Sequence, residues 1–174
     1  MTQAVQPLWT TDDLKTFLQD EEWQAADAIT LQLMLEATDR LSEGWLDVNA
    51  IANLPCPMLH ELDRLWLEAS QGRFGFSIQS QIYSQEAQYD TFQLGQQAGW
   101  LMFRSKPLAF FKLYDFLNFS IDAPPGHLPA LWYWKIPWAT SWLTGGFGTG
   151  RGLGYGDRRM FDAMMLRLER CSLI

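Results

Sequence analysis

The sequence predicts an all-α fold, a compact helical bundle with a single domain. Three observations favour it: apolar residues recur at three- and four-residue steps in several segments, capping residues precede these segments, and Gly or Pro follows them. With 174 residues, 48% of them hydrophobic, the chain can bury one substantial core but is too short for two. We therefore expect residues 1–10 to form an N-terminal tail and residues 11–174 to form one core domain.

Two helices are predicted near the N-terminus. Thr11 precedes two aspartates and then the apolar positions Leu14 and Phe17, which is typical of a capped helix. From Glu21 onward a longer helix turns one face inward, until Gly44 ends the region. The inward positions of this second helix are Trp23, Ala26, Thr30, Leu33, Met34 and Ala37.

The next two helices lie on either side of a proline-containing stop. Asp47 is expected to cap a brief helix that carries Val48 and Ile51. After Pro55-Cys56-Pro57 a longer helix begins, because proline in a first turn loses no helical hydrogen bond. Gly72 is the expected end of that helix, since Gly accepts the left-handed conformation that closes many helices. Its buried positions are Leu59, Leu62, Leu65 and Trp66.

The following segments are less regular. Phe74, Phe76 and Ile78 alternate through an expected extended turn, and Ser77 is the expected cap of the next helix. A further helix is predicted to start at Asp90 and to end near Gly99, and residues 100–123 are predicted to be irregular with helical turns.

The C-terminal third combines a glycine-rich segment with a final helix. Seven glycines in residues 145–156 predict a mobile loop. The last helix is expected to close the core and to keep Arg158, Asp162 and Glu169 mostly off its buried face. Its buried face consists of Phe161, Met164, Met165, Leu168 and Cys171.

Charge and cysteine content limit the classes of function. Thirteen basic and twenty acidic residues give a net charge of −7, which argues against binding to nucleic acid. Cys56 and Cys171 lie far apart, and the N-terminus resembles no secretory signal, so we expect reduced thiols in a cytoplasmic protein. The longest apolar stretch, residues 128–143, is too short for a membrane span.

Enzyme and metal motifs are not matched. The glycine-rich segment lacks the Gly-Lys pair of a phosphate-binding loop, because Gly150 is followed by Arg151. There are only two histidines and no HExxH or GxSxG motif, so neither a metal centre nor a nucleophile elbow is expected. His127 is interpreted as a polar residue at a turn whose ring bonds to backbone groups. We therefore expect a binding protein without catalytic residues.

The aromatic content is high, with nine Trp, eleven Phe and five Tyr. A tetrapyrrole is a broad apolar disc with carboxylates at one edge, and it needs aromatic walls and cations at the rim. The candidate walls are Trp132, Trp134, Trp138, Trp142, Phe147 and Tyr155, and the candidate cations are Arg151, Arg158 and Arg159. Two alternatives stay open: the tryptophans form an aromatic core, and the last two arginines pair with Asp157 or Asp162.

Two segments carry a family resemblance. Gly72-Arg73-Phe74-Gly75-Phe76-Ser77 and Gly126-His127-Leu128-Pro129 occur in the order and spacing of the "genomes uncoupled" (GUN4-like) porphyrin-binding family, which the chain resembles from about Leu14 onward. The resemblance implies an all-helical fold with a concave porphyrin-binding surface. It also implies pocket roles for Trp134 and Arg158, and Phe74 and Phe76 join the candidate ligand-binding residues.

The same resemblance implies a function. Members of this family bind protoporphyrin IX or Mg-protoporphyrin IX and stimulate magnesium chelatase in chlorophyll biosynthesis, acting with its large porphyrin-binding subunit. For this chain we expect a monomer in the cytoplasm of a cyanobacterial-type cell, with no cofactor beyond that ligand and no metal held by the protein. The alternatives are a bilin carrier and an interaction protein with an aromatic surface. Peripheral membrane contact is a further alternative, which the net negative charge opposes.

Overall fold

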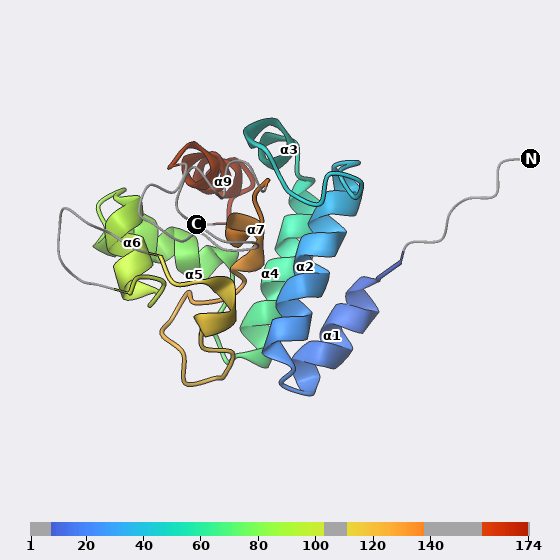
Figure 1. Cartoon of the computed structure of the whole chain (residues 1–174), viewed down its shortest axis with the longest axis horizontal. Helices are drawn as coiled ribbons and strands as arrows, with labels where there is room; N and C mark the ends of the chain where they lie inside the picture. Colours follow the sequence, from blue (N-terminus) through green and yellow to red (C-terminus); the bar gives the residue numbers. More distant parts are fainter. Residues whose placement is uncertain (1–7, 103–110, 138–157, 174) are drawn as a thin grey trace, which may run out of the picture.

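The secondary structure of the described residues consists of helices and the segments that connect them. A computed structural model describes residues 8–102, 111–137 and 158–173, and within these ranges the secondary-structure elements are all helices, which confirms the predicted all-α class. In Figure 1 the two long helices run side by side, the first helix lies beside them, and the later helices gather on the other side. The first four helices are α1 (Thr11–Gln19), α2 (Trp23–Ala37), α3 (Val48–Ala52) and α4 (Cys56–Ala69).

These first helices begin where the sequence indicates. Thr10, one residue before the expected cap, accepts a hydrogen bond from the Asp13 N–H at 3.2 Å, and the Asp13 carboxylate accepts one from the Thr10 N–H at 2.8 Å. Asp47 caps α3 by accepting from the Ala50 N–H at 2.8 Å. Proline occupies the first turn of α4 as predicted. The starts of α1, α3 and α4 are therefore fixed by neighbouring residues.

The second half has shorter and more varied helices. The predicted cap at Ser77 is wrong, because α5 has already begun at Phe76 and Gly75 holds the capping position with φ of +144°. The predicted helix after Asp90 is confirmed, and this residue accepts from the Phe92 N–H at 2.8 Å. The elements are α5 (Phe76–Gln81), a π-helical turn η1 (Ile82–Glu86), α6 (Thr91–Gln97), a 3-10 turn η2 (Tyr114–Phe116), α7 (Leu131–Trp134) and α9 (Arg158–Arg170).

Two of these short helices are capped by aspartates from the long helices. Asp63 on α4 accepts from the Ser77 N–H at 2.8 Å, and a Cβ at Gly75 would lie only 2.7 Å from its carboxylate. Asp27 on α2 accepts from the Ala130 N–H at 2.9 Å and from the Leu131 N–H at 3.0 Å. Neither α5 nor α7 has a side-chain cap within its own segment. Their starts therefore depend on packing against α4 and α2.

Burial of Asp27 changes its proton affinity. Its carboxylate also accepts a hydrogen bond from the Tyr114 hydroxyl at 3.0 Å. Burial raises the pKa of Asp27 to about 7, although its three hydrogen-bond donors lower it. The cap of α7 therefore changes charge near neutral pH.

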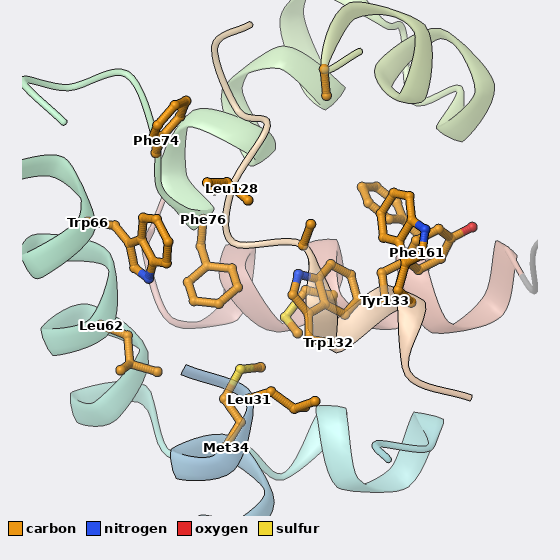
Figure 2. Packing of buried hydrophobic residues seen from close by; sticks show 14 of the residues in the cluster. Leu31, Met34, Leu62, Trp66, Phe74, Phe76, Leu128, Trp132, Tyr133 and Phe161 are labelled. Carbon is orange, nitrogen blue, oxygen red and sulfur yellow. The ribbon is translucent and has the colours of Figure 1, made fainter. Parts of the chain in front are cut away.

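The core is strongly aromatic. Figure 2 shows side chains from α2, α4, α5, α7 and α9 turned toward a common interior. Four buried indole N–H groups in this core, those of Trp66, Trp100, Trp132 and Trp134, donate to acceptors inside the protein, such as the Thr30 hydroxyl for Trp66 at 3.0 Å and the His127 carbonyl for Trp100 at 2.9 Å. The fully buried aromatic side chains include Trp66, Phe74, Phe76, Trp100, Trp132, Tyr133, Trp134 and Phe161.

His127 has the structural role expected from the sequence. Its side chain is buried, Nε2 accepts from the Asn118 N–H at 3.1 Å, and Nδ1 bonds to the Ala98 carbonyl. Burial lowers the pKa of His127 to about 4, so the ring is neutral at physiological pH. The imidazole therefore connects the backbone at the end of α6, at Ala98, to the backbone at Asn118.

The expectation of reduced cysteines is wrong. Cys56 and Cys171 form a disulfide across a sequence separation of 115, with their Cα atoms 5.2 Å apart. The bond joins the first residue of α4 to the turn after α9, where His60 Nε2 also bonds to the Cys171 carbonyl at 2.7 Å. Arg167 donates two hydrogen bonds to the Leu54 carbonyl nearby. The separation of the two cysteines along the sequence did not predict their distance in space, because helix packing brings the start of α4 close to the end of α9.

Candidate functional site

Four of the predicted ligand-binding residues belong to the core. Trp132 is 1% exposed, and Trp134, Phe74 and Phe76 are completely buried. Trp132 stacks on Phe161 with ring centroids 5.8 Å apart, and its indole N–H donates to a backbone carbonyl. The expectation that these four side chains line an open surface therefore does not hold, and the aromatic-core interpretation applies to them.

Of the remaining predicted ligand-binding residues, one is exposed and the others lie partly or wholly outside the described part of the chain. Arg159 is exposed in the first turn of α9. Arg158 begins this helix, but its side chain lies outside the described part. The rest of the predicted set also lies outside the described residues, together with the glycine-rich segment 145–156; these residues are Trp138, Trp142, Phe147, Arg151 and Tyr155.

A groove with a cavity volume of about 470 Å³ lies between the α5–η1 segment and α9. This volume is within the range of small-molecule sites, roughly 300 to 1,000 Å³. None of its lining residues was predicted as a site residue. They are Ser80, Tyr83, Ser84, Gln85, Tyr89, Asp162, Met165, Leu166 and Glu169.

Tyrosines from η1 and the turn after it form one side of the groove. The Tyr83 and Tyr89 rings meet edge to face with centroids 5.6 Å apart, and Tyr89 is 70% exposed. Gln88 and Tyr89 both have positive φ, 49° and 62°, which is uncommon for residues other than Gly. The Tyr89 N–H donates to the Tyr83 carbonyl at 2.9 Å and holds this turn. The exposed ring is therefore presented by a specific, strained backbone conformation.

The other side of the groove is one face of α9. Asp162, Leu166 and Glu169 follow one another at steps of four and three residues, which places them on the same face. The Tyr83 hydroxyl lies 3.0 Å from Asp162 Oδ1 and donates a hydrogen bond to it. No ion pair among the described residues involves either carboxylate. The groove therefore offers negative charge and hydroxyl groups beside apolar surface, which suits a cationic partner better than a carboxylate.

Arg159 lies at the N-terminal end of the same helical face. It precedes Asp162 by three residues, about one turn of α9. The start of α9 thus carries positive charge, whereas the groove beyond it carries negative charge. An anionic ligand is favoured near the first turn and disfavoured along the groove.

The sequence contained a partial signal for this groove. Asp162 and Glu169 were expected off the buried face of the last helix, and the structure leaves both exposed. The η1 side was missed, because a π-helical turn inside a longer helical segment has no simple apolar period.

The described residues lack two features of other protein classes, a metal-ligand cluster and a membrane-spanning helix. They contain no cluster of three His, Cys, Asp or Glu side chains able to hold a metal ion. Among the same residues, no helix has the length and apolar character needed to cross a membrane.

Comparisons with known proteins identify relatives of the chain. A family model described as GUN4-like matches residues 8–145. The "Uncharacterized protein ycf53" of Porphyra purpurea is 32% identical over 120 residues, covering 67% of this chain and 48% of the relative. The "Tetrapyrrole-binding protein, chloroplastic" of Arabidopsis thaliana is 22% identical over 125 residues, covering 68% and 47%. The chain thus spans about half the length of the curated relatives it matches.

Solved structures show the same fold. The structure of GUN4 from Chlamydomonas reinhardtii has a TM-score of 0.64 at 20% identity and covers 95% of this chain and 93% of its own. The ligand-free structure of Arabidopsis thaliana GUN4 has a TM-score of 0.65 at 18% identity, with coverages of 90% and 94%. At these identities the likeness establishes the fold alone.

Proposed function

The chain belongs to the GUN4-like family, and from this membership we propose that it binds a tetrapyrrole, protoporphyrin IX or Mg-protoporphyrin IX, without catalysing a reaction. The observation that carries the proposal is the family match over residues 8–145. The Arabidopsis relative whose name records tetrapyrrole binding supports the ligand class.

The proposed site lies beside the start of α9. Arg158 and Arg159 begin this helix, and Arg159 is exposed. Guanidinium groups bind carboxylates through paired hydrogen bonds, so these arginines are suited to orient the propionates of a porphyrin. The aromatic residues proposed to cover the macrocycle immediately precede them in the sequence, namely Trp138, Trp142, Phe147 and Tyr155, with Arg151 as a further cation.

Affinity would come mainly from removing the macrocycle from water. Burial of a few hundred square ångströms of apolar surface at ~25 cal/mol per Å² yields several kcal/mol, before the cost of ordering is subtracted. A metal in the ligand would be held by the macrocycle nitrogens, and with two histidines in the chain we propose no protein ligand to it.

The proposed biological role is stimulation of magnesium chelatase. In this role the protein presents its porphyrin to the large porphyrin-binding subunit of that enzyme in a cyanobacterial-type cell or a plastid. The family match and the chloroplast relative support the role. A reconstituted chelatase assay with and without this protein tests it, and an unchanged rate of magnesium insertion would contradict it.

Ligand titrations test the binding proposal directly. Protoporphyrin IX, Mg-protoporphyrin IX and the bilin biliverdin are each added to the protein, and ligand absorption and tryptophan fluorescence are recorded. We expect saturable binding of the porphyrins with a shifted absorption band. Equal and weak quenching by all three ligands would contradict a tetrapyrrole site, whereas preferential binding of biliverdin would assign the site to bilins.

Arginine variants test the position of the site. Arg158→Ala and Arg159→Ala are each expected to weaken porphyrin binding about tenfold, because each loses a charge-assisted hydrogen bond. Arg64→Ala is the matched control, since Arg64 on α4 is exposed and pairs with Glu61 at 2.7 Å and with Glu68 at 2.6 Å. Equal weakening in all three variants would indicate a nonspecific charge effect and contradict the proposed position.

A further inference from the structure

The groove between η1 and α9 has chemistry that the proposed porphyrin site does not use. Its two carboxylates, Asp162 and Glu169, would repel the propionates of a tetrapyrrole. They are seven residues apart on one face of α9, which separates them by about 10 Å along the helix axis. This separation is too large for both carboxylates to coordinate one small cation.

We propose that this groove is a docking site for a basic segment of a partner protein, with Lys or Arg side chains directed at Asp162 and Glu169. The complementarity of charge identifies the occupant. Two basic side chains about 10 Å apart match the carboxylates, a spacing found between residues i and i+3 of a polyproline II segment and between i and i+7 of a helix.

The tyrosine side of the groove adds a second feature that favours basic side chains. Tyr89 exposes its ring beside Tyr83, and the faces of such rings attract guanidinium and ammonium groups. The positive φ values at Gln88 and Tyr89 set the direction of this ring before any partner binds. The Tyr83 hydroxyl orients the Asp162 carboxylate in the same way. The groove is thus preorganised for cations on both sides.

The apolar surface of the groove indicates a polypeptide rather than a small cation. Leu166 is 47% exposed along the groove, and Met165 lies beside it in the lining. These side chains offer contact area to the aliphatic stems of Lys and Arg and to the residues between them. A second copy of this chain is a poor occupant, because each copy carries a net charge of −7.

Peptide binding to the full chain tests the proposal. The probe is a fluorescein-labelled nine-residue peptide of alanines and glycines with two arginines at positions i and i+3, and its fluorescence anisotropy is followed as protein is added. We expect saturable binding that weakens with added salt. A peptide with glutamates in place of the arginines should not bind. A second peptide carries its two arginines at positions i and i+7. Failure of both arginine peptides to bind would overturn the proposal.

Variants locate the binding to the groove. Asp162→Asn, Glu169→Gln and Tyr89→Ala are each expected to weaken peptide binding about two- to fivefold, as for partly exposed ion pairs and ring contacts. Asp12→Asn, on the exposed side of α1, removes the same charge elsewhere and should leave the affinity unchanged. Equal weakening by Asp12→Asn would show a nonspecific charge effect and overturn the proposal.

Two further measurements separate the alternatives. Binding of spermidine at the groove without binding of the peptide would assign the site to a small polyamine and overturn the proposal. Porphyrin titration of Glu169→Gln should match that of the unmodified protein, because the docking groove and the proposed porphyrin site use different residues. Loss of peptide binding in Glu169→Gln therefore supports the docking groove whether or not the unmodified protein binds a porphyrin.

Discussion

The first helices of this molecule and two short helices of its second half, α5 and α7, are capped by different means. In the half that contains α1 to α4, the caps of α1 and α3 come from within three residues, as with Thr10 and Asp47. In the half that begins with α5, two helices are capped by Asp63 and Asp27, which lie 14 and 104 residues earlier in the chain. Residues near in sequence therefore cap α1 and α3, whereas α5 and α7 depend on contacts with helices of the first half.

Helix length separates α5 and α7 from the two long helices that cap them. α2 and α4 contain 15 and 14 residues, whereas α5 and α7 contain six and four. Isolated helices shorter than about 12 residues are marginal in water, so the short helices gain their stability from tertiary contacts. Changes at the contacts between the halves should therefore cost more stability than changes at local caps.

The largest effect is expected for the covalent link between the halves. Cys171→Ser removes the Cys56–Cys171 disulfide, which closes a loop of 115 residues. From the loop-closure entropy, this variant should lose about 4 to 5 kcal/mol of unfolding free energy. Urea denaturation without reductant measures the loss. The unmodified protein measured with dithiothreitol is the control and should reproduce it, and equal stability with and without the bond would contradict the prediction.

The next largest effect is expected at the buried cap of α7. Asp27→Ala leaves the Ala130 and Leu131 N–H groups and the Tyr114 hydroxyl without their acceptor. The loss should be about 3 kcal/mol, because several buried donors become unsatisfied together. Denaturation measures it, and Tyr114→Phe, which removes one donor, should lose much less. If both variants lose the same amount, the helix cap is not the main role of Asp27.

The protonation of Asp27 gives a pH dependence with a defined sign. Burial raises the folded-state pKa of this carboxyl from 3.8 to about 7. Between these values the folded state binds more protons than the unfolded state, so its stability should fall as pH rises from about 4 to 7. Asp27→Asn does not titrate, so the stability of the unmodified protein relative to this variant should fall over the same interval. A relative stability that rises with pH would contradict the predicted direction.

The smallest effect is expected at a local cap. Thr10→Ala removes the side-chain acceptor of the Asp13 N–H at the exposed start of α1. The loss should be about 1 kcal/mol, the usual value for an N-cap. Thr10→Ser keeps the hydroxyl and should retain most of the stability. A loss at Thr10 as large as that of Asp27→Ala would remove the distinction between the two halves.

The same distinction explains how far the sequence could be interpreted. The starts of α3 and α4 followed from Asp47 and Pro57, because both signals act within one turn. The short helix at Leu131–Trp134 was missed, since its cap comes from α2. Local patterns are sufficient where a helix is stabilised by its neighbours in sequence, and insufficient where distant segments supply the missing bonds.

The candidate site shows the same limit. The tryptophans at 132 and 134 were expected to line a ligand site, and a buried indole N–H needs a hydrogen-bond acceptor. The structure supplies these partners from backbone carbonyls, those of Pro129 at 3.2 Å and Lys112 at 2.9 Å. Composition could show that aromatic residues were abundant, but it could not show which of them had acceptors inside the protein. The exposed acidic face of α9, in contrast, was visible from helical spacing.

The disulfide also determines what a protease can release. Every peptide bond between Cys56 and Cys171 belongs to a covalent ring. A single cleavage within this ring would leave both fragments attached, and they would migrate as one band on a gel until a reductant was added. A single cleavage between Ala52 and Cys56 would instead detach the segment that carries α1, α2 and α3 from the ring, so only noncovalent packing would retain these helices.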